Sequence, residues 1–100
     1  MKIIQNVELY FETNEIEELS ELINEKDIEI IHGLKEENWG QRTIRIYDPD
    51  KFIIEIAEPM SNVIIRYYKS GKSLEKISKK TQMPLNTIKT ILLKKINANY

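Results

Sequence analysis

Three observations predict an α+β fold for this 100-residue chain, with a single βαβββ module followed by a small three-helix tail. Apolar and polar residues alternate near the start of the chain with the period of a strand. Apolar residues then recur at helical spacing. The balance of charge reverses at about residue 60, which indicates a change of structural unit. We therefore assign one domain to residues 1–59 and a second to residues 60–100.

The first strand and the first helix are expected in the first quarter of the chain. The strand covers residues 3–13, with apolar side chains on one face and polar side chains on the other. Asn14 is the expected helix N-cap, and Glu17 completes a capping box three residues later. The helix runs to about Lys26. Its apolar stripe consists of Ile16, Leu19, Leu22 and Ile23.

Three further strands complete the module. They are expected over residues 28–32, 41–47 and 51–57, with a polar loop over residues 33–40. The last two strands are joined by an Asp-Pro-Asp turn, whose carboxylates can accept hydrogen bonds from nearby backbone N–H groups. Lys51 must occupy a turn position that often requires a positive φ.

The tail is predicted to form three short helices. Ser61 and Ser73 are expected to cap the first two, Gly71 ends the first, and Pro84 opens the third. The apolar stripe of the first helix consists of Val63, Ile64, Tyr67 and Tyr68. The other two helices carry Leu74, Ile77, Leu85, Ile88, Ile91 and Leu92.

Charge is divided between the two domains. Residues 1–60 contain fifteen Asp and Glu against six Lys and Arg, whereas residues 61–100 contain one Glu against nine Lys and Arg. The two parts are expected to attract each other, within one chain or between chains. The alternative is that the tail is simply a helical element coated with lysine.

Composition excludes several classes of protein. No apolar run approaches the roughly 20 residues needed to span a bilayer. No signal peptide is expected at the N-terminus. The absence of cysteine excludes disulfides and thiolate chemistry. We expect a cytoplasmic protein with no membrane partner.

Three segments of the first domain resemble the C-terminal βαβββ module of the glyoxalase/bleomycin-resistance/extradiol-dioxygenase group, the vicinal oxygen chelate superfamily. They are Val7-Glu8-Leu9-Tyr10-Phe11, the Trp39-Gly40 turn, and Asp48-Pro49-Asp50 followed by Ile54-Glu55. The resemblance implies a divalent metal ion, such as Mn²⁺ or Mg²⁺, bound by Glu8 and Glu55. It also implies that Glu55 is catalytic. A carboxylate among apolar side chains is costly unless it is paired, protonated or bound to a metal.

An alternative is open for both carboxylates, which can pair with Arg42 or Arg45 on neighbouring strands. We favour this pairing over a metal site. The substrate pocket is expected to be lined by Tyr10, Trp39, Arg45 and Tyr47. For Trp39 we favour a core position over a pocket position, and we interpret His32 as an ordinary polar residue at the end of a strand.

A lone βαβββ module leaves a sheet face and strand edges uncovered. Proteins of the group join two modules, and this chain has room for one. It is either a natural short form or a fragment of a two-module protein, and in both cases we expect a homodimer that completes the cup around a small molecule. The function is then a metal-assisted lyase or dioxygenase, or alternatively a non-catalytic binding protein. Four carboxylates near a dimer axis would require a hard cation such as Mn²⁺, Mg²⁺ or Ca²⁺.

The tail contains Ser73-Leu74-Glu75-Lys76-Ile77-Ser78, a turn at Gln82-Met83-Pro84, and Thr87-Ile88. In these segments it resembles a helix-turn-helix, which gives the third hypothesis, a DNA-associated regulator. The third helix would present Asn86, Lys89, Thr90 and Lys94 to the major groove. However, Gln82 replaces the Gly that usually occupies the turn. We therefore favour a lid or a dimerisation element over nucleic-acid binding.

Overall fold

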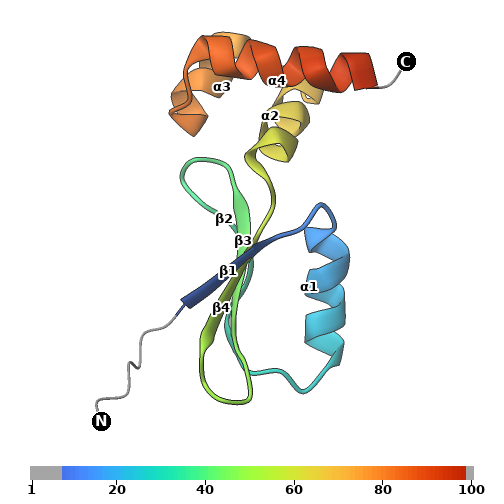
Figure 1. Cartoon of the computed structure of the whole chain (residues 1–100), viewed down its shortest axis with the longest axis vertical. Coiled ribbons are helices and arrows are strands. Elements are labelled where there is room, and N and C mark those ends of the chain that lie inside the picture. Colours follow the sequence, from blue (N-terminus) through green and yellow to red (C-terminus); the bar gives the residue numbers. More distant parts are fainter. Residues whose placement is uncertain (1–7, 99–100) are drawn as a thin grey trace. The chain divides into compact units, whose positions relative to one another are not determined.

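The computed structural model describes residues 8–98 and divides into two compact units (Figure 1). The sheet unit contains the described residues up to Glu37 together with Arg42–Glu58. The helical unit contains Asn38–Gln41 and the residues from Pro59 onwards. A four-stranded sheet and four helices confirm the predicted α+β class. In this part of the chain, no helix combines the length and the apolar character that a bilayer span requires.

The sheet unit has the predicted β-α-β-β-β order (Figure 1). Its strands are arranged β1-β4-β3-β2, so that β1 lies at one edge. β1 runs parallel to β4, whereas β3 is antiparallel to both β2 and β4. The elements are β1 (Glu8–Glu12), α1 (Ile16–Glu25), β2 (Ile30–Glu36), β3 (Arg42–Tyr47) and β4 (Ile53–Ala57).

The core of the sheet unit lies between α1 and one face of the sheet. It consists of five buried isoleucines, Ile16 and Ile23 from α1 with Ile44, Ile46 and Ile56 from the strands. Burying such a side chain stabilises a fold by about 1.5–3 kcal/mol. β1 does not share this burial, because Leu9 is 43% exposed and Phe11 is 54% exposed. The prediction of a half-buried first strand is therefore wrong for the described part of β1.

Two predicted boundaries are also wrong. β2 continues to Glu36, so residues 33–36 belong to a strand and not to a loop. The register with β3 shifts on both sides of His32, and such irregularities disguise a strand pattern in the sequence. Helix α1 begins at Ile16, with Glu15 and not Asn14 at the N-cap. Residues 3–7 of the predicted first strand lie outside the described residues.

The turn between β3 and β4 forms as predicted. The Asp48 carboxylate accepts hydrogen bonds from the backbone N–H groups of Asp50 and Phe52, at 2.8 and 2.9 Å. Lys51 has a φ of +69°, the left-handed conformation expected at this position. A hydrogen bond from its ammonium group to the Glu29 carboxylate raises the pKa of Lys51.

The helical unit consists of α2 (Met60–Lys69), α3 (Leu74–Thr81) and α4 (Leu85–Ala98). Their shared core contains Val63, Ile64, Tyr67, Ile77, Ile88 and Leu92. The predicted stripe of α2 is thus confirmed except for Tyr68, which is 50% exposed. Ser73 caps α3 as predicted, but α2 is capped by Pro59 without a side-chain bond, so the prediction for Ser61 is wrong. Gly71 follows α2 with a φ of +94°, the conformation expected of a Gly after a helix.

Candidate functional site

The face of the sheet opposite α1 carries a row of polar side chains. Side chains alternate between the two faces of a strand, so the residues between the buried isoleucines point away from α1. Arg45 in β3 is the direct partner of Glu55 in β4, and Glu55 is the direct partner of Tyr10 in β1. The register therefore brings Glu8, Tyr10, Arg45, Tyr47 and Glu55 onto one face of one sheet.

Arg45 contacts both carboxylates of this face. Its Nη2 and Nε donate to Glu8 Oε1 at 2.7 and 3.2 Å. Its Nε also lies 3.7 Å from Glu55 Oε1. The hydrogen bond to Glu8 raises the pKa of Arg45, against a smaller opposing effect of desolvation. Glu8 and Glu55 thus both lie next to one guanidinium group, whose single positive charge partly offsets their two negative charges.

The donor set of this face does not fit a resident metal ion in one chain. Mg²⁺ and Ca²⁺ are bound through carboxylate oxygens together with water, and here both carboxylates already contact Arg45. Across residues 8–98, no three His, Cys, Asp or Glu side chains are grouped so that they could hold a metal ion. A cation at Glu8 and Glu55 would have to displace the guanidinium group, and water or another chain would have to supply its remaining ligands.

The other predicted pocket residues are divided between the units. Tyr10 is half-exposed and its hydroxyl donates to Glu12 Oε2 at 2.9 Å. The Tyr47 ring has the Lys51 ammonium nitrogen 5.8 Å from its centroid. Trp39 belongs to the helical unit. It is 40% exposed and its Nε1 donates to Gln41 Oε1, so the prediction of a core position is wrong.

His32 lies within β2, and not at the end of a strand as predicted. It is the register partner of Arg45, and its Nδ1 is 2.9 Å from the Gly33 carbonyl oxygen. His32 therefore adds a polar group at the β2 edge of the sheet, beside Arg45.

Sequence reasoning missed the ion pair between Arg42 and Glu58. The two side chains lie 3.0 Å apart, and the Glu58 side chain is 2% exposed. A hydrogen bond to Glu58 is the main reason that the pKa of Arg42 is raised. Glu17 of α1 contacts the same guanidinium, so this pair lies on the side of the sheet that α1 covers. No local sequence pattern would have identified it, because the partners are sixteen residues apart.

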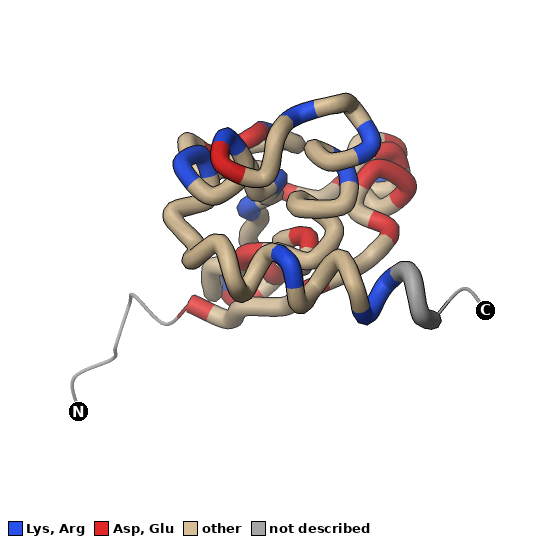
Figure 2. The backbone as a smooth tube through the Cα atoms, turned by 90° about the horizontal axis from the view of Figure 1, so that it is seen from above, with Lys and Arg blue, Asp and Glu red and all other residues tan. Residues whose placement is uncertain are grey.

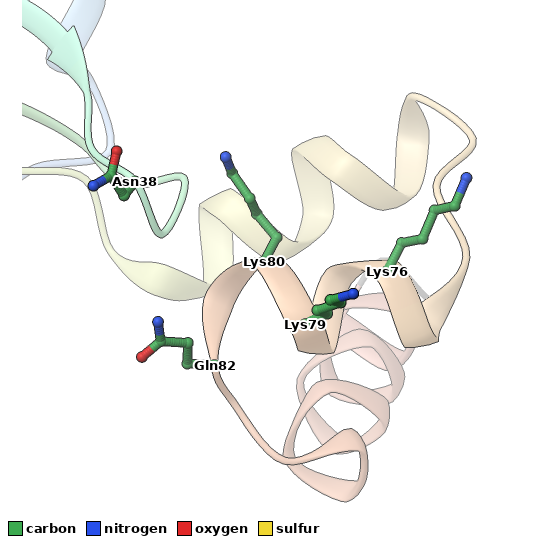
Figure 3. Close-up of a pocket in the computed structure, with 5 residues that line it drawn as sticks. All are labelled: Asn38, Lys76, Lys79, Lys80 and Gln82. Atoms are coloured by element: carbon green, nitrogen blue, oxygen red, sulfur yellow. The ribbon is translucent and has the colours of Figure 1, made fainter.

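A second candidate site lies within the helical unit. A pocket of about 390 Å³ is lined by three lysines of α3 and by two amide side chains (Figure 3). The lining residues are Asn38, Lys76, Lys79, Lys80 and Gln82.

The sequence model of the glyoxalase-like domain family matches residues 2–61 of this chain. The chain belongs to the glyoxalase-like domain family. This confirms the predicted superfamily, and the glyoxalase-like segment covers the whole β-α-β-β-β order.

Solved structures resemble the glyoxalase-like part. A protein of unknown function from Agrobacterium tumefaciens str. C58 is 39% identical, with a TM-score of 0.51 over 56% of this chain and 44% of that one. A protein described as a conserved domain protein is 17% identical, with a TM-score of 0.52 over 58% and 51%. A glyoxalase/bleomycin resistance protein/dioxygenase superfamily member from Sphaerobacter thermophilus DSM 20745 is 21% identical, with a TM-score of 0.49 over 54% and 45%. The match spans about half the length of these proteins, and no curated protein matches the chain.

Proposed function

We propose that this glyoxalase-like protein is a non-catalytic binding protein, which holds a small molecule against the face of its sheet opposite α1. The observation that carries the proposal is the contact of Arg45 with both Glu8 and Glu55. These are the two positions at which the family resemblance implies metal ligands. A guanidinium group that contacts both carboxylates supplies hydrogen-bond donors to a ligand without the Lewis acidity of a metal.

A second copy of the chain completes the cup in this proposal. β1 lies at the edge of the sheet, where its backbone groups can pair with another chain. Leu9, Tyr10 and Phe11 are each between 43% and 54% exposed on this edge strand. Burying the two apolar side chains against a partner would contribute roughly 1.5–3 kcal/mol for each.

Sedimentation equilibrium tests the dimer. The full chain should show twice its mass of 11.9 kDa. L9T/F11T, which keeps residues of high strand propensity, should shift the protein to a monomer. Leu93→Thr is the matched control, because Leu93 is 59% exposed but belongs to the helical unit. A wild-type monomer at every concentration would remove the composite cup.

A metal-assisted lyase or dioxygenase is the second candidate function. The observation that favours it is that Glu8 and Glu55 lie close enough to contact one guanidinium group. In a dimer, two such pairs would supply four carboxylates. These carboxylates would then hold a divalent metal ion, which would polarise a substrate oxygen.

Thermal unfolding with and without Mn²⁺ separates the two functions. In the binding protein, Mn²⁺ should leave the wild-type melting temperature unchanged. R45Q frees both carboxylates and should gain a Mn²⁺-dependent rise, which E8Q/R45Q should lose. A rise in the wild type that E8Q and E55Q both abolish would favour the metal enzyme instead.

Native mass spectrometry tests for the ligand itself. The dimer purified under gentle conditions should carry a small-molecule mass increment, and R45Q should reduce the bound fraction. Leu93→Thr should retain it. A dimer without any increment would count against the proposal.

A further inference from the structure

The helical unit presents an excess of positive charge. Among residues 61–98, Glu75 is the only acidic residue, against nine Lys and Arg (Figure 2). The eight lysines of this set are all exposed. In the part of the chain that the structure describes, the lysines of α3 form no ion pair with any carboxylate. Their charge is therefore available to an anionic partner.

Three of these lysines, all on α3, line the pocket. Lys76 and Lys80 are one helical turn apart, so they lie along the same side of the helix. The Lys80 and Gln82 side chains extend towards the side on which Asn38 lies (Figure 3). The lysine ammonium groups and the two side-chain amides supply N–H donors to this pocket. Its side-chain acceptors are the two amide oxygens, and none of the lining side chains is a carboxylate. A phosphate group, which offers several anionic acceptor oxygens, matches the lining.

The turn between α3 and α4 is ordered by its own side chains. Gln82 has a φ of +60°, so it adopts the left-handed conformation that a Gly would supply. Ser78 Oγ donates to the Met83 carbonyl oxygen at 2.6 Å, and Thr81 Oγ1 donates to the Ile77 carbonyl oxygen at 2.8 Å. The replacement of Gly by Gln82 therefore does not break the turn. This removes the objection that Gln82 raised against a helix-turn-helix.

Helix α4 exposes a polar face next to this turn. Between Leu85 and Lys95, its buried residues are Ile88 and Leu92, which belong to the core of the unit. Its exposed polar residues include Asn86, Lys89, Thr90 and Lys94, which share this face with the exposed Leu93. Amide and lysine side chains are the types that read base edges in the major groove of DNA.

We propose that the helical unit binds duplex DNA, with a backbone phosphate in the α3 pocket and the polar face of α4 directed at the bases. The spread of lysines over all three helices favours a polyanion over a single small anion. The helix pair with a short ordered turn favours a duplex over a single strand. This activity is separate from small-molecule binding by the sheet unit.

Fluorescence anisotropy of the full chain with a labelled mixed-sequence duplex tests the proposal. The affinity should fall steeply between about 50 and about 200 mM salt. K76Q/K80Q removes two phosphate contacts and should bind more weakly. Because each contact contributes about 0.9 to the salt slope, the fall in affinity over this salt range should be about tenfold smaller for the variant.

The control variant K26Q/K35Q changes net charge equally, but its lysines belong to the sheet unit. It should bind the duplex like the wild type. Equal weakening by both variants would show diffuse attraction and overturn the assigned site. Tighter binding of a single strand, or equal binding of heparin, would overturn the duplex assignment. N86A/K89A should weaken binding as well, and circular dichroism should establish that every variant keeps its helices.

Discussion

The Arg42 backbone N–H and the Arg42 guanidinium group both donate to the Glu58 carboxylate, each at 3.0 Å. The Glu58 N–H returns a hydrogen bond to the Arg42 carbonyl oxygen at 3.1 Å. These bonds join the first residue of β3 to the residue that follows β4, and so they close the end of the β3–β4 pair. One buried carboxylate thus fixes the position where the chain leaves the sheet.

Glu58→Ala should destabilise the protein by about 2 kcal/mol, because the partly buried Arg42 donors lose a buried charged acceptor. Urea unfolding monitored by circular dichroism measures the loss. The control is Glu17→Gln, which removes the other carboxylate from the same guanidinium group. Glu17 has a side chain that is 63% exposed, so its loss should cost less than about 1 kcal/mol. Equal effects of the two variants would contradict a dominant role for Glu58.

Gly40→Ala should destabilise the protein by about 3 kcal/mol. Gly40 has a φ of +90°, and an added Cβ would lie 2.6 Å from the Tyr67 hydroxyl oxygen. Gly71→Ala has a similar φ but open space around it, so it should cost only about 1 kcal/mol. A double-mutant cycle with Tyr67→Phe, followed by thermal unfolding, should recover part of the Gly40→Ala loss. Additive effects would exclude the steric contact.

Lys51→Gly should be more stable than Lys51→Ala by roughly 0.5–1 kcal/mol. Both substitutions remove the exposed ion pair with Glu29, but only Gly relieves the positive φ. The pKa of Lys51 is raised by that pair, so the contribution of the pair is present at neutral pH and disappears as the pH rises past the raised pKa. The two variants should therefore be compared by chemical denaturation at neutral pH and again at alkaline pH. Their difference should persist at both, whereas the wild type should lose its advantage over Lys51→Ala at alkaline pH.

Ser73→Ala should cost about 1 kcal/mol, because the Ser73 hydroxyl accepts the Lys76 backbone N–H at 3.2 Å. Ser61→Ala makes the same chemical change inside α2, where Pro59 occupies the cap position. It should cost less than half as much. Thermal unfolding of the two variants measures both losses of stability. A larger loss for Ser61→Ala than for Ser73→Ala would contradict the cap assignments.

The sequence predicted those parts of the fold that depend on local chemistry. The Asp48 turn, the positive φ of Lys51 and the Ser73 cap each follow from a few neighbouring residues. The common face of Glu8 and Glu55 follows from counting along two strands once the family resemblance fixes their pairing. These features need no knowledge of how distant segments meet.

The missed features all depend on tertiary contacts. β2 continues past Gly33 because β3 pairs with it through an irregular register. Such a register does not appear in the sequence as a regular alternation of apolar and polar residues. The exposure of the Leu9 and Phe11 side chains depends on where α1 packs against the sheet. The contact between Arg42 and Glu58 depends on the alignment of two strand ends. Such relationships appear only when the sheet is assembled.

The segment Asn38–Gln41 makes the helical unit discontinuous along the chain. The polypeptide passes between the units at three places, and Arg66 Nη2 donates to the Gly40 carbonyl oxygen at 2.9 Å. A gene cut at residue 59 would separate this guanidinium group from its acceptor and Tyr67 from the glycine against which it fits. The tail therefore cannot be transplanted or deleted as one continuous segment of the chain. Any exchange of it between homologous proteins must carry the four-residue loop along with the helices.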